Sequence, residues 1–390
     1  MRILHLCLAA SYVEGLSYQE NLLSQAHKMM GFDVYVISGL KTFSKDGEYT
    51  YDNQANSYIN KYGIKVQKLE YKKPQKVNRM LRKYVGTYQA LEKAAPDIIF
   101  IHGIQFADVS IVIKYLKCHP NVIVYADNHA DFSNSATNWI SKNIKHKMLW
   151  MHYAKMIEPY VLRFYGVLPA RVDFLINMYS LPKKKVELLV MGAADELVEA
   201  ALRPQVKSEI REKYGIAQDD FLIMSGGKID FAKKQTFLLM DAVNQIDNPN
   251  VKLIVFGSVL PELKDELQKR CSDRVRYIGW VESEESYNYF ASADLVAFPG
   301  RHSVFWEQVV GLGIPMVVKF WEGTTHVDIG GNVKYLYEDS ADEIKNILEE
   351  ITNRDYKQML EMAHGEKRKR FLYSGIARQA IVDVLNKKIK

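Results

Sequence analysis

Residues 3–39 read ILHLCLAASYVEGLSYQENLLSQAHKMMGFDVYVISG, and this stretch decides the fold class. It begins and ends with a short apolar run, as buried strands do. The apolar residues between the two runs recur at helical spacing: Leu22, Leu23, Ala26 and Met30. A strand, a helix and a second strand in this order predict a parallel sheet covered by helices.

The same alternation continues along the 390 residues and predicts two doubly wound, Rossmann-like α/β domains facing a central cleft. We expect three segments: a first domain at 1–197, a second domain at 198–365, and a C-terminal helix at 366–390 that packs on either domain. Further strands are expected at 97–103, 121–127 and 186–192 in the first half, and at 221–227, 251–258, 274–281, 294–300 and 314–320 in the second.

The composition is that of an ordinary globular protein with a modest net charge of +6. Its three cysteines are too few and too scattered for a disulfide framework or a zinc site. The N-terminal run resembles a signal peptide, but a helix and a second strand follow at domain spacing, which favours a buried strand. No apolar run is long enough to span a membrane. These features predict a cytoplasmic protein.

A strand in the second half leads into SGGKIDFAKKQ, residues 225–235. Glycines such as Gly227 let a backbone approach a ligand closely, and Lys228, Lys233 and Lys234 precede a predicted helix. A helix N-terminus carries partial positive charge, so this turn is suited to a diphosphate, although solvated lysines at a surface turn are the alternative. The GxxxxGK[ST] order of a P-loop is absent.

A second polar stretch lies between two apolar strands at 298–318, FPGRHSVFWEQVVGLGIPMVV. Glu307 falls in the first turn of a short helix, where a carboxylate is stabilised, and it is placed to accept hydrogen bonds from a ribose diol. A simple helix-start charge is the alternative. His302 and His326 are as consistent with structural roles as with functional ones.

In the first half, His129 lies between Asp127 and Asp131 just past a strand, which suits a histidine that orients a hydroxyl or a sugar. His102 is a weaker candidate. Gly15, in the first strand-to-helix loop, would allow backbone contact with a phosphate. The GxGxxG pattern is absent, which disfavours a nicotinamide dinucleotide.

The order GGKIDFAKK, VKLIVFG, VRYIGWVESEESYNYFASADLVAFPG and WEQVVGLGIPMVV resembles the donor-binding half of retaining glycosyltransferase family 4, whose members have the GT-B fold. The resemblance covers residues 185–320. It implies that Lys228 and Lys233 bind the donor diphosphate and that Glu307 binds the nucleotide ribose.

The register departs from the family pattern in two ways. Counting back from the Gly-Ile-Pro segment at 313–315 places Gln308, not Glu307, at the usual spacing. The first glutamate of the family's pair has no counterpart, because Pro299 or Gly300 stands there. The loop 300–303 replaces it, so the resemblance implies that His302 or Ser303 contacts the donor sugar.

The resemblance also implies transfer with retention of configuration and without a required metal. No DxD motif lies between the strands. The lysines would then neutralise charge growing on the departing diphosphate. In the family's front-face reaction a donor phosphate oxygen takes the acceptor proton, so His129 would orient rather than deprotonate.

Two basic stretches in the first half suggest where an acceptor is presented. Residues 61–84 hold seven lysines and two arginines against one glutamate, and residues 142–156 mix lysines with aromatic and apolar residues. Such stretches suit an anionic membrane surface and a lipid-diphosphate acceptor. A solvated face is the plain alternative, and no RNA-binding motif is present.

The sequence therefore predicts a retaining glycosyltransferase that moves a sugar from a nucleotide-sugar donor to a glycan or a lipid-linked acceptor, in surface polysaccharide synthesis, with peripheral membrane association. We expect no cofactor, no metal and no nucleic acid. Two alternatives remain: an inactive GT-B protein that binds a nucleotide or a partner enzyme, and nucleotide-sugar epimerisation.

Overall fold

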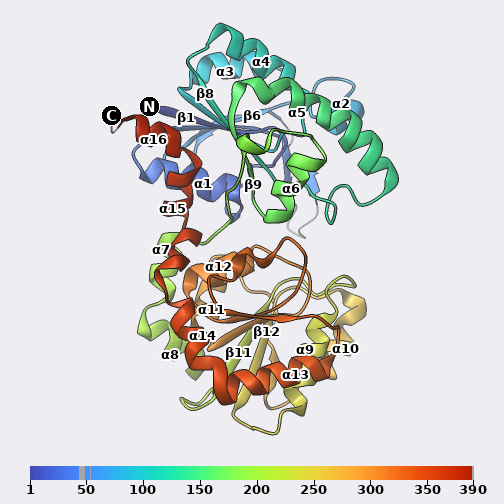
Figure 1. Ribbon diagram of the computed structural model, residues 1–390, viewed down its shortest axis with the longest axis vertical. Helices are drawn as coiled ribbons and strands as arrows, with labels where there is room; N and C mark the ends of the chain where they lie inside the picture. Colours follow the sequence, from blue (N-terminus) through green and yellow to red (C-terminus); the bar gives the residue numbers. More distant parts are fainter. Residues whose placement is uncertain (44–48, 53, 389–390) are drawn as a thin grey trace. The chain divides into compact units, whose positions relative to one another are not determined.

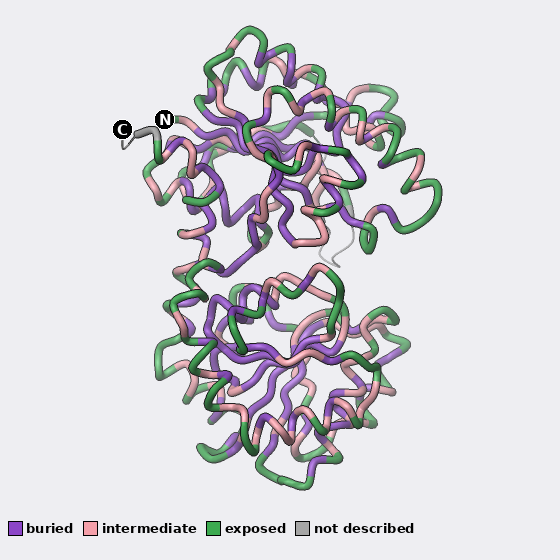
Figure 2. Tube along the Cα trace, in the orientation of Figure 1, coloured by how far each residue is buried: buried purple, intermediate pink, exposed green. Residues whose placement is uncertain are grey.

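The computed structural model describes residues 1–43, 49–52 and 54–388 (Figure 1). The chain divides into two compact units, Met1–Val190 with Ile376–Lys390, and Met191–Gly375. The division after Val190 falls shortly before the boundary expected from the sequence. In each unit the strands form the buried centre, and the exposed residues lie on the helices and loops around it, as Figure 2 shows.

The first unit is built on an eight-stranded sheet with the order β10-β9-β8-β7-β1-β2-β6-β5. All neighbours pair in parallel except β5 with β6. The strands of this unit are β1 (Arg2–Cys7), β2 (Asp33–Gly39), β5 (Ser57–Ile59), β6 (Lys65–Leu69), β7 (Ile98–His102), β8 (Ile123–Asn128), β9 (Val161–Gly166) and β10 (Val186–Leu188), with a separate antiparallel pair β3 (Lys41–Phe43) and β4 (Tyr49–Tyr51).

Helices connect these strands. They are α1 (Gln19–Met29), α2 (Gln75–Leu81), α3 (Thr87–Ala94), α4 (Val109–Cys118), the π-helix η1 (Ser141–Trp150), α5 (Met151–Ile157), α6 (Pro169–Asn177) and, from the far end of the chain, α16 (Val382–Lys388). The strands β1 and β7 are buried along almost their whole length. This near-continuous burial is typical of a parallel sheet that is covered on both faces.

The second unit holds a six-stranded parallel sheet with the order β13-β12-β11-β14-β15-β16. Its strands are β11 (Phe221–Gly226), β12 (Val251–Phe256), β13 (Val275–Tyr277), β14 (Leu295–Phe298), β15 (Met316–Lys319) and β16 (Val333–Leu336). Its helices are α7 (Asp195–Ala201), α8 (Pro204–Lys213), α9 (Gln235–Gln245), α10 (Lys264–Gln268), α11 (Ser286–Ser292), α12 (Phe305–Leu312), α13 (Ala341–Glu350) with its π-helical continuation η6 (Ile351–Asp355), and α14 (Tyr356–Ala363).

All ten predicted strands are present, which confirms the α/β class. The prediction missed the parallel strands β6, β9 and β16. The prediction of one helix over 366–387 is wrong: a 3₁₀ segment (Glu366–Phe371) is followed by α15 (Tyr373–Ala380) and α16. Leu372, between the 3₁₀ segment and α15, has an extended backbone. It forms a bridge with Ala193, whose N–H donates to Phe371 O and whose carbonyl accepts from Tyr373 N.

Candidate functional site

A glycine turn at the end of β11 forms one wall of a pocket in the second unit. Gly227 has φ +131°, a conformation that side chains rarely adopt, and its N–H donates to Phe256 O at 3.0 Å. A Cβ on the neighbouring Gly257 would lie 2.0 Å from Gly227 O. The two glycines therefore let the ends of β11 and β12 approach each other and expose the backbone to a ligand.

The pocket lies at the carboxyl ends of β11, β12 and β14, where ligands bind in open α/β sheets. Helix α9 begins beside it, and its Thr236 lines the pocket. The first N–H groups of a helix have no intrahelical acceptor and favour an anion. The lining residues are Ser225, Gly226, Gly227, Lys228, Ile229, Lys233, Thr236, Val255, Phe256, Phe298, Pro299, Gly300, Arg301 and Ser303.

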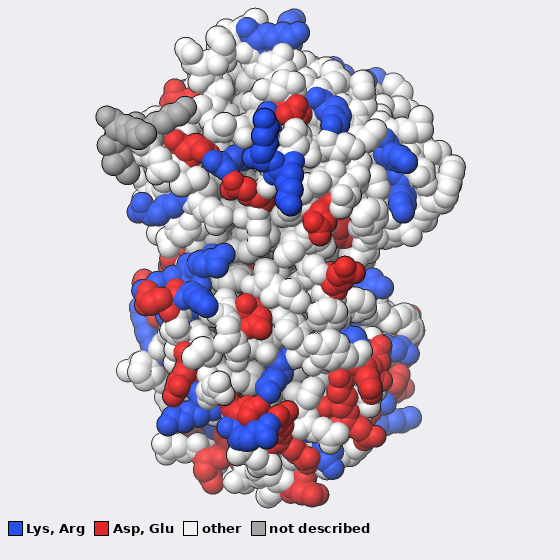
Figure 3. All heavy atoms as spheres, in the orientation of Figure 1, with Lys and Arg blue, Asp and Glu red and all other residues white. Residues whose placement is uncertain are grey.

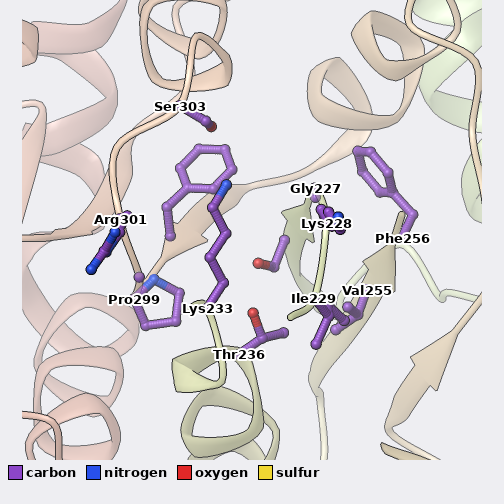
Figure 4. A pocket seen from close by; sticks show the side chains of 14 residues that line it. Gly227, Lys228, Ile229, Lys233, Thr236, Val255, Phe256, Pro299, Arg301 and Ser303 are labelled. Atoms are coloured by element: carbon purple, nitrogen blue, oxygen red, sulfur yellow. The ribbon is translucent and has the colours of Figure 1, made fainter. Parts of the chain in front are cut away.

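Three cations gather at this pocket: Lys228, Lys233 and Arg301. Figure 4 shows Lys233 extending into the pocket between the β14 loop and the glycine turn. Burial lowers the pKa of Lys233, Asp230 opposes this effect, and the charges of Lys228 and Arg301 add to it. A bound anion would relieve this repulsion. Sequence reasoning missed Arg301, although it stands in the 298–318 stretch, and Thr236, which directly follows the 225–235 stretch.

The structure divides the predicted residues of the 298–318 stretch between two places. Ser303 lines the pocket, whereas His302 and Glu307 are not among its lining residues. Glu307 is fully buried in α12, and one of its oxygens accepts hydrogen bonds from His302 Nε2 and His326 Nε2, each at 2.9 Å. Burial favours the neutral acid, but the two histidines prevail and lower the pKa of Glu307 to about 2.

This His302–Glu307–His326 cluster ties the pocket loop to α12 and to the 3₁₀ turn Thr325–Val327. The ligand-type atoms of the three residues lie within 4.8 Å of one another, a spacing that would also accept a metal ion. Through Oε1 Glu307 braces this loop, while its Oε2 has no partner in the described structure, so the predicted ribose contact stays a prediction.

Gln308, the next residue of α12, differs from Glu307 in its hydrogen bonding. Its side chain is almost fully buried, and neither its amide oxygen nor its amide nitrogen has a hydrogen-bond partner in the described structure. A buried amide without partners costs about 1–3 kcal/mol. Such a group is often retained because it meets a ligand. Glu307 Oε2 is likewise buried without a partner in the described structure, so both register alternatives keep hydrogen-bonding capacity: one oxygen on Glu307 and the whole amide on Gln308.

The predicted residues of the first unit meet at the ends of β7 and β8. Asp127 is buried and lies 2.9 Å from His102 Nδ1 and 3.5 Å from His129 Nε2. Burial opposes ionisation of Asp127, but the histidines outweigh it and lower its pKa. Burial likewise opposes protonation of His129, but Asp127 prevails and raises the pKa of His129. His129 is partly exposed, so its ring can contact a ligand.

Two other predicted residues of this unit lie elsewhere in its loops. Asp131 is engaged by Arg171 Nε at 3.0 Å and by Ser133, so it shapes its loop rather than orienting His129. Gly15 has φ +79°, and a Cβ added there would meet nothing within 4 Å. It is therefore open to a ligand, and only its backbone angle restricts substitution.

Comparison with known proteins agrees with this geometry. Residues 206–358 match the family model of glycosyl transferases group 1, and this range covers the pocket. In fold, HepE of Anabaena, solved with UDP, is similar over 99% of this chain and 100% of its own, with a TM-score of 0.69 at 16% identity. The chain has the GT-B glycosyltransferase fold.

Two further proteins that are similar to this chain are an epimerase and an uncharacterised glycosyltransferase. The UDP-GlcNAc 2-epimerase of Neisseria meningitidis, solved with UDP-GlcNAc, shares the GT-B architecture over 99% of this chain and 100% of its own, with a TM-score of 0.63 at 15% identity. An uncharacterised glycosyltransferase of Methanocaldococcus jannaschii is 23% identical over 36% of this chain. That match spans 38% of the relative's length.

Proposed function

We propose that this protein is a retaining glycosyltransferase that uses a nucleotide-sugar donor. The observation that carries the proposal is the pocket in which Lys228, Lys233 and Arg301 meet the start of α9 and an open glycine turn. This combination suits two phosphates, because the backbone supplies donors and the side chains supply charge. It stabilises a diphosphate leaving group without a protein nucleophile.

Within this proposal each predicted residue has a role. Lys228 and Lys233 hold the diphosphate, Gln308 takes the ribose, and Ser303 contacts the donor sugar. The His302–Glu307–His326 cluster fixes the loop that carries Ser303. In the first unit, His129 orients the reacting hydroxyl while Asp127 holds its ring. The lysines replace a metal as the source of positive charge.

A uridine nucleotide is the first donor class to test, because the GT-B neighbours HepE and the epimerase were solved with UDP or UDP-sugars. The experiment is a thermal-shift panel of UDP, GDP, ADP and CMP. A ligand at 100 times its Kd stabilises the folded state by ~2.7 kcal/mol, a rise of a few degrees in Tm. We expect UDP to shift Tm. No shift with any nucleotide would refute the donor site.

A second candidate function is nucleotide binding without transfer. It is favoured by Gly300, which stands where the family's pattern has a glutamate and which lines the pocket. Slow hydrolysis of the bound UDP-sugar separates the two, because a transferase leaks its sugar to water and a scaffold does not. Analysis of the sugar product without acceptor also reveals an epimerase.

For the acceptor we propose a lipid-linked glycan at an anionic membrane surface, reached from the cytoplasm in surface polysaccharide synthesis. The support is an apolar ridge along the π-helix η1 and the residues before it. Trp139 and Met148 are 70% and 67% exposed, and Ile140 and Ile144 are exposed between them. Ile140, Ile144 and Met148 recur every four positions, which places them on one side of the helix.

Basic residues flank this ridge and lie beside the first basic stretch. The guanidinium of Arg82, at the end of α2, is 5.9 Å from the ring of Trp150. Burial of Lys145, together with the nearby charge of Arg82, lowers the pKa of Lys145. Helix α2 also exposes Val77 and Met80. On the face in Figure 3 both units show basic and acidic groups side by side. None of the described helices is long and apolar enough to cross a bilayer.

A further inference from the structure

Three buried histidines and one buried aspartate form an unbroken line through the first unit. His27 Nε2 lies 3.1 Å from Ala377 O, and His27 Nδ1 lies 3.0 Å from His5 Nε2. His5 Nδ1 lies 2.9 Å from His102 Nε2, and His102 Nδ1 lies 2.9 Å from Asp127 Oδ2. The four side chains come from α1, β1, β7 and β8, and all are at most 1% exposed.

This line contains four hydrogen bonds, and each requires one proton. Three neutral imidazoles supply only three N–H groups. The two ends, the carbonyl of Ala377 and the carboxylate of Asp127, are both acceptors and supply none. The line is therefore complete only with a fourth proton, which makes either one histidine an imidazolium or Asp127 a neutral acid.

The four bonds by themselves can be completed with the extra proton on any of the four groups, but His102 is the one of the three histidines that borders the carboxylate of Asp127, where its positive charge would be paired. With the charge there, a neutral His27 donates from Nε2 to the carbonyl of Ala377 and accepts at Nδ1 from His5 Nε2. A neutral His5 then accepts at Nδ1 from His102 Nε2, and the second proton of His102, on Nδ1, is donated to an ionised Asp127. Burial also lowers the pKa of His5 and of His27, which keeps both neutral, and the pKa of Asp127 is lowered by its histidines.

We propose that His102 is a doubly protonated positioning residue, held by His5 and His27, that keeps Asp127 ionised and directed at His129. Asp127 Oδ1 accepts from Gly103 N at 2.9 Å, which fixes its other oxygen between the rings of His102 and His129. The other titratable groups that interact here are Cys7, Glu20 and Arg171. Burial raises the pKa of the Cys7 thiol, so it stays neutral.

The line also reaches a helix end far away in the sequence. Ala377 lies in the last turn of α15, where carbonyls have no intrahelical donor. His27 donates to one of them, and Tyr165 OH lies 3.3 Å from Gln379 O and from Ala380 O. The protonation of Asp127 and His129 is thereby coupled to the docking of residues 376–388.

The test is a long-range ¹H–¹⁵N spectrum of the full-length protein labelled in histidine. A doubly protonated ring has two similar nitrogen shifts, whereas a neutral ring has two widely separated ones. We expect His102 to be doubly protonated at neutral pH and His5 and His27 to be neutral. A neutral His102 in the unmodified protein would overturn the proposal, whichever residue carries the fourth proton.

Two substitutions of His5 test the line. His5→Asn keeps an oxygen near the place of Nδ1, so His102 should retain both protons. His5→Leu removes the acceptor, and His102 should lose one proton at neutral pH. An unchanged His102 spectrum in folded His5→Leu would refute the role of the line. His152→Gln, an exposed site, controls for signal loss. If His5→Leu does not fold, the spectrum of the unmodified protein still decides the protonation state.

The catalytic consequence rests on the proposed function and has its own readout. In His5→Leu we expect kcat for transfer to fall at least tenfold and its pH profile to change, with the donor KM unchanged. His5→Asn should restore most of kcat. If no nucleotide shifts the Tm of the unmodified protein, the donor site is refuted, but the protonation state of His102 read from the ¹H–¹⁵N spectrum still stands. Unchanged kcat in folded His5→Leu refutes the positioning role.

Discussion

Lys233 and Lys234 are neighbours in sequence, yet they face different surroundings. Lys233 lines the pocket, whereas Lys234 is exposed, lies over the ring of Phe231 and pairs with Glu266 at 4.0 Å. They therefore offer a matched comparison. Lys233→Ala should abolish the thermal shift with UDP, and Lys234→Ala should preserve it. Equal loss in both variants would show that general surface charge, not this pocket, binds the nucleotide.

Gln308→Leu should separate stability from binding. Its amide is buried and has no partner among the described residues, so an apolar side chain of similar size should leave the free protein as stable or raise its Tm. If the amide meets the ribose, nucleotide affinity should fall by about tenfold, or ~1.4 kcal/mol. Titration calorimetry measures the affinity, and an unchanged Kd would remove Gln308 from the site.

Glu307→Leu should have the reverse effect on stability. It leaves the Nε2 atoms of His302 and His326 without their shared acceptor, and removing one partner of a buried pair costs about 3–5 kcal/mol. Unfolding in urea measures the loss. A stable Glu307→Leu variant that no longer binds UDP would instead support direct ribose contact by Glu307.

The proposed absence of a metal can be tested at the same cluster. We expect activity to survive EDTA and dialysis, because lysines carry the charge at the diphosphate. Activity that EDTA abolishes and zinc restores would contradict this. If His302→Gln then prevents restoration, the ion would lie at the His302–Glu307–His326 cluster, whose spacing accepts one.

Acid should destabilise the first unit through three buried histidines, because burial lowers the pKa of His5 as well as those of His27 and His146. Burial lowers the pKa of His27 and of His146 from 6.5 to about 4. Between these values the unfolded chain binds more protons, so stability present above pH 6.5 is lost as the pH falls toward 4. The slope is ~1.4 kcal/mol per pH unit per histidine. Urea unfolding across this range measures it, and His146→Gln should remove one histidine's share. A flat profile would contradict both assignments.

Membrane binding should depend on the ridge of η1. The double variant Ile144→Asp and Met148→Asp should reduce sedimentation with anionic vesicles at least tenfold, because carboxylates oppose both burial and surface charge. Met29→Asp, at an equally exposed methionine of α1, is the matched control. Vesicles without anionic lipid test the role of the lysines. Equal binding by all three proteins would exclude this ridge.

The fold was largely predictable from the sequence because buried parallel strands are continuous apolar runs. The missed strand β9 reads VLRFYG, and its Arg163 interrupts the run; this side chain is satisfied by Asp383, 220 positions away, at 2.6 and 2.7 Å. β6 was missed for a similar reason, since its buried Lys68 pairs with Asp52. Long-range pairing of this kind leaves no local signal.

The site was predictable only where motif and chain order suffice. Lys228, Lys233, Gly227 and Ser303 line the pocket as expected. The roles of Glu307 and Gln308 could not be separated, because they depend on which side of a helix turn faces the histidines. His102 and Asp127 were singled out, but the line that they form with His5 and His27 was missed, since the three histidines lie far apart in the sequence. Its one local sign is a histidine inside the apolar run ILHLCLA.

The division of the chain has a consequence for biosynthesis. The second unit, Met191–Gly375, is continuous, whereas the first needs residues 376–390, which follow it. A ribosome therefore completes the later unit before the earlier one has all its parts. Until residues 377 and 383 have been synthesised, His27 lacks its hydrogen bond to the carbonyl of Ala377, and Arg163 lacks its ion pair with Asp383. The nascent first unit therefore lacks these contacts throughout synthesis of the second, an interval in which a chaperone can protect it.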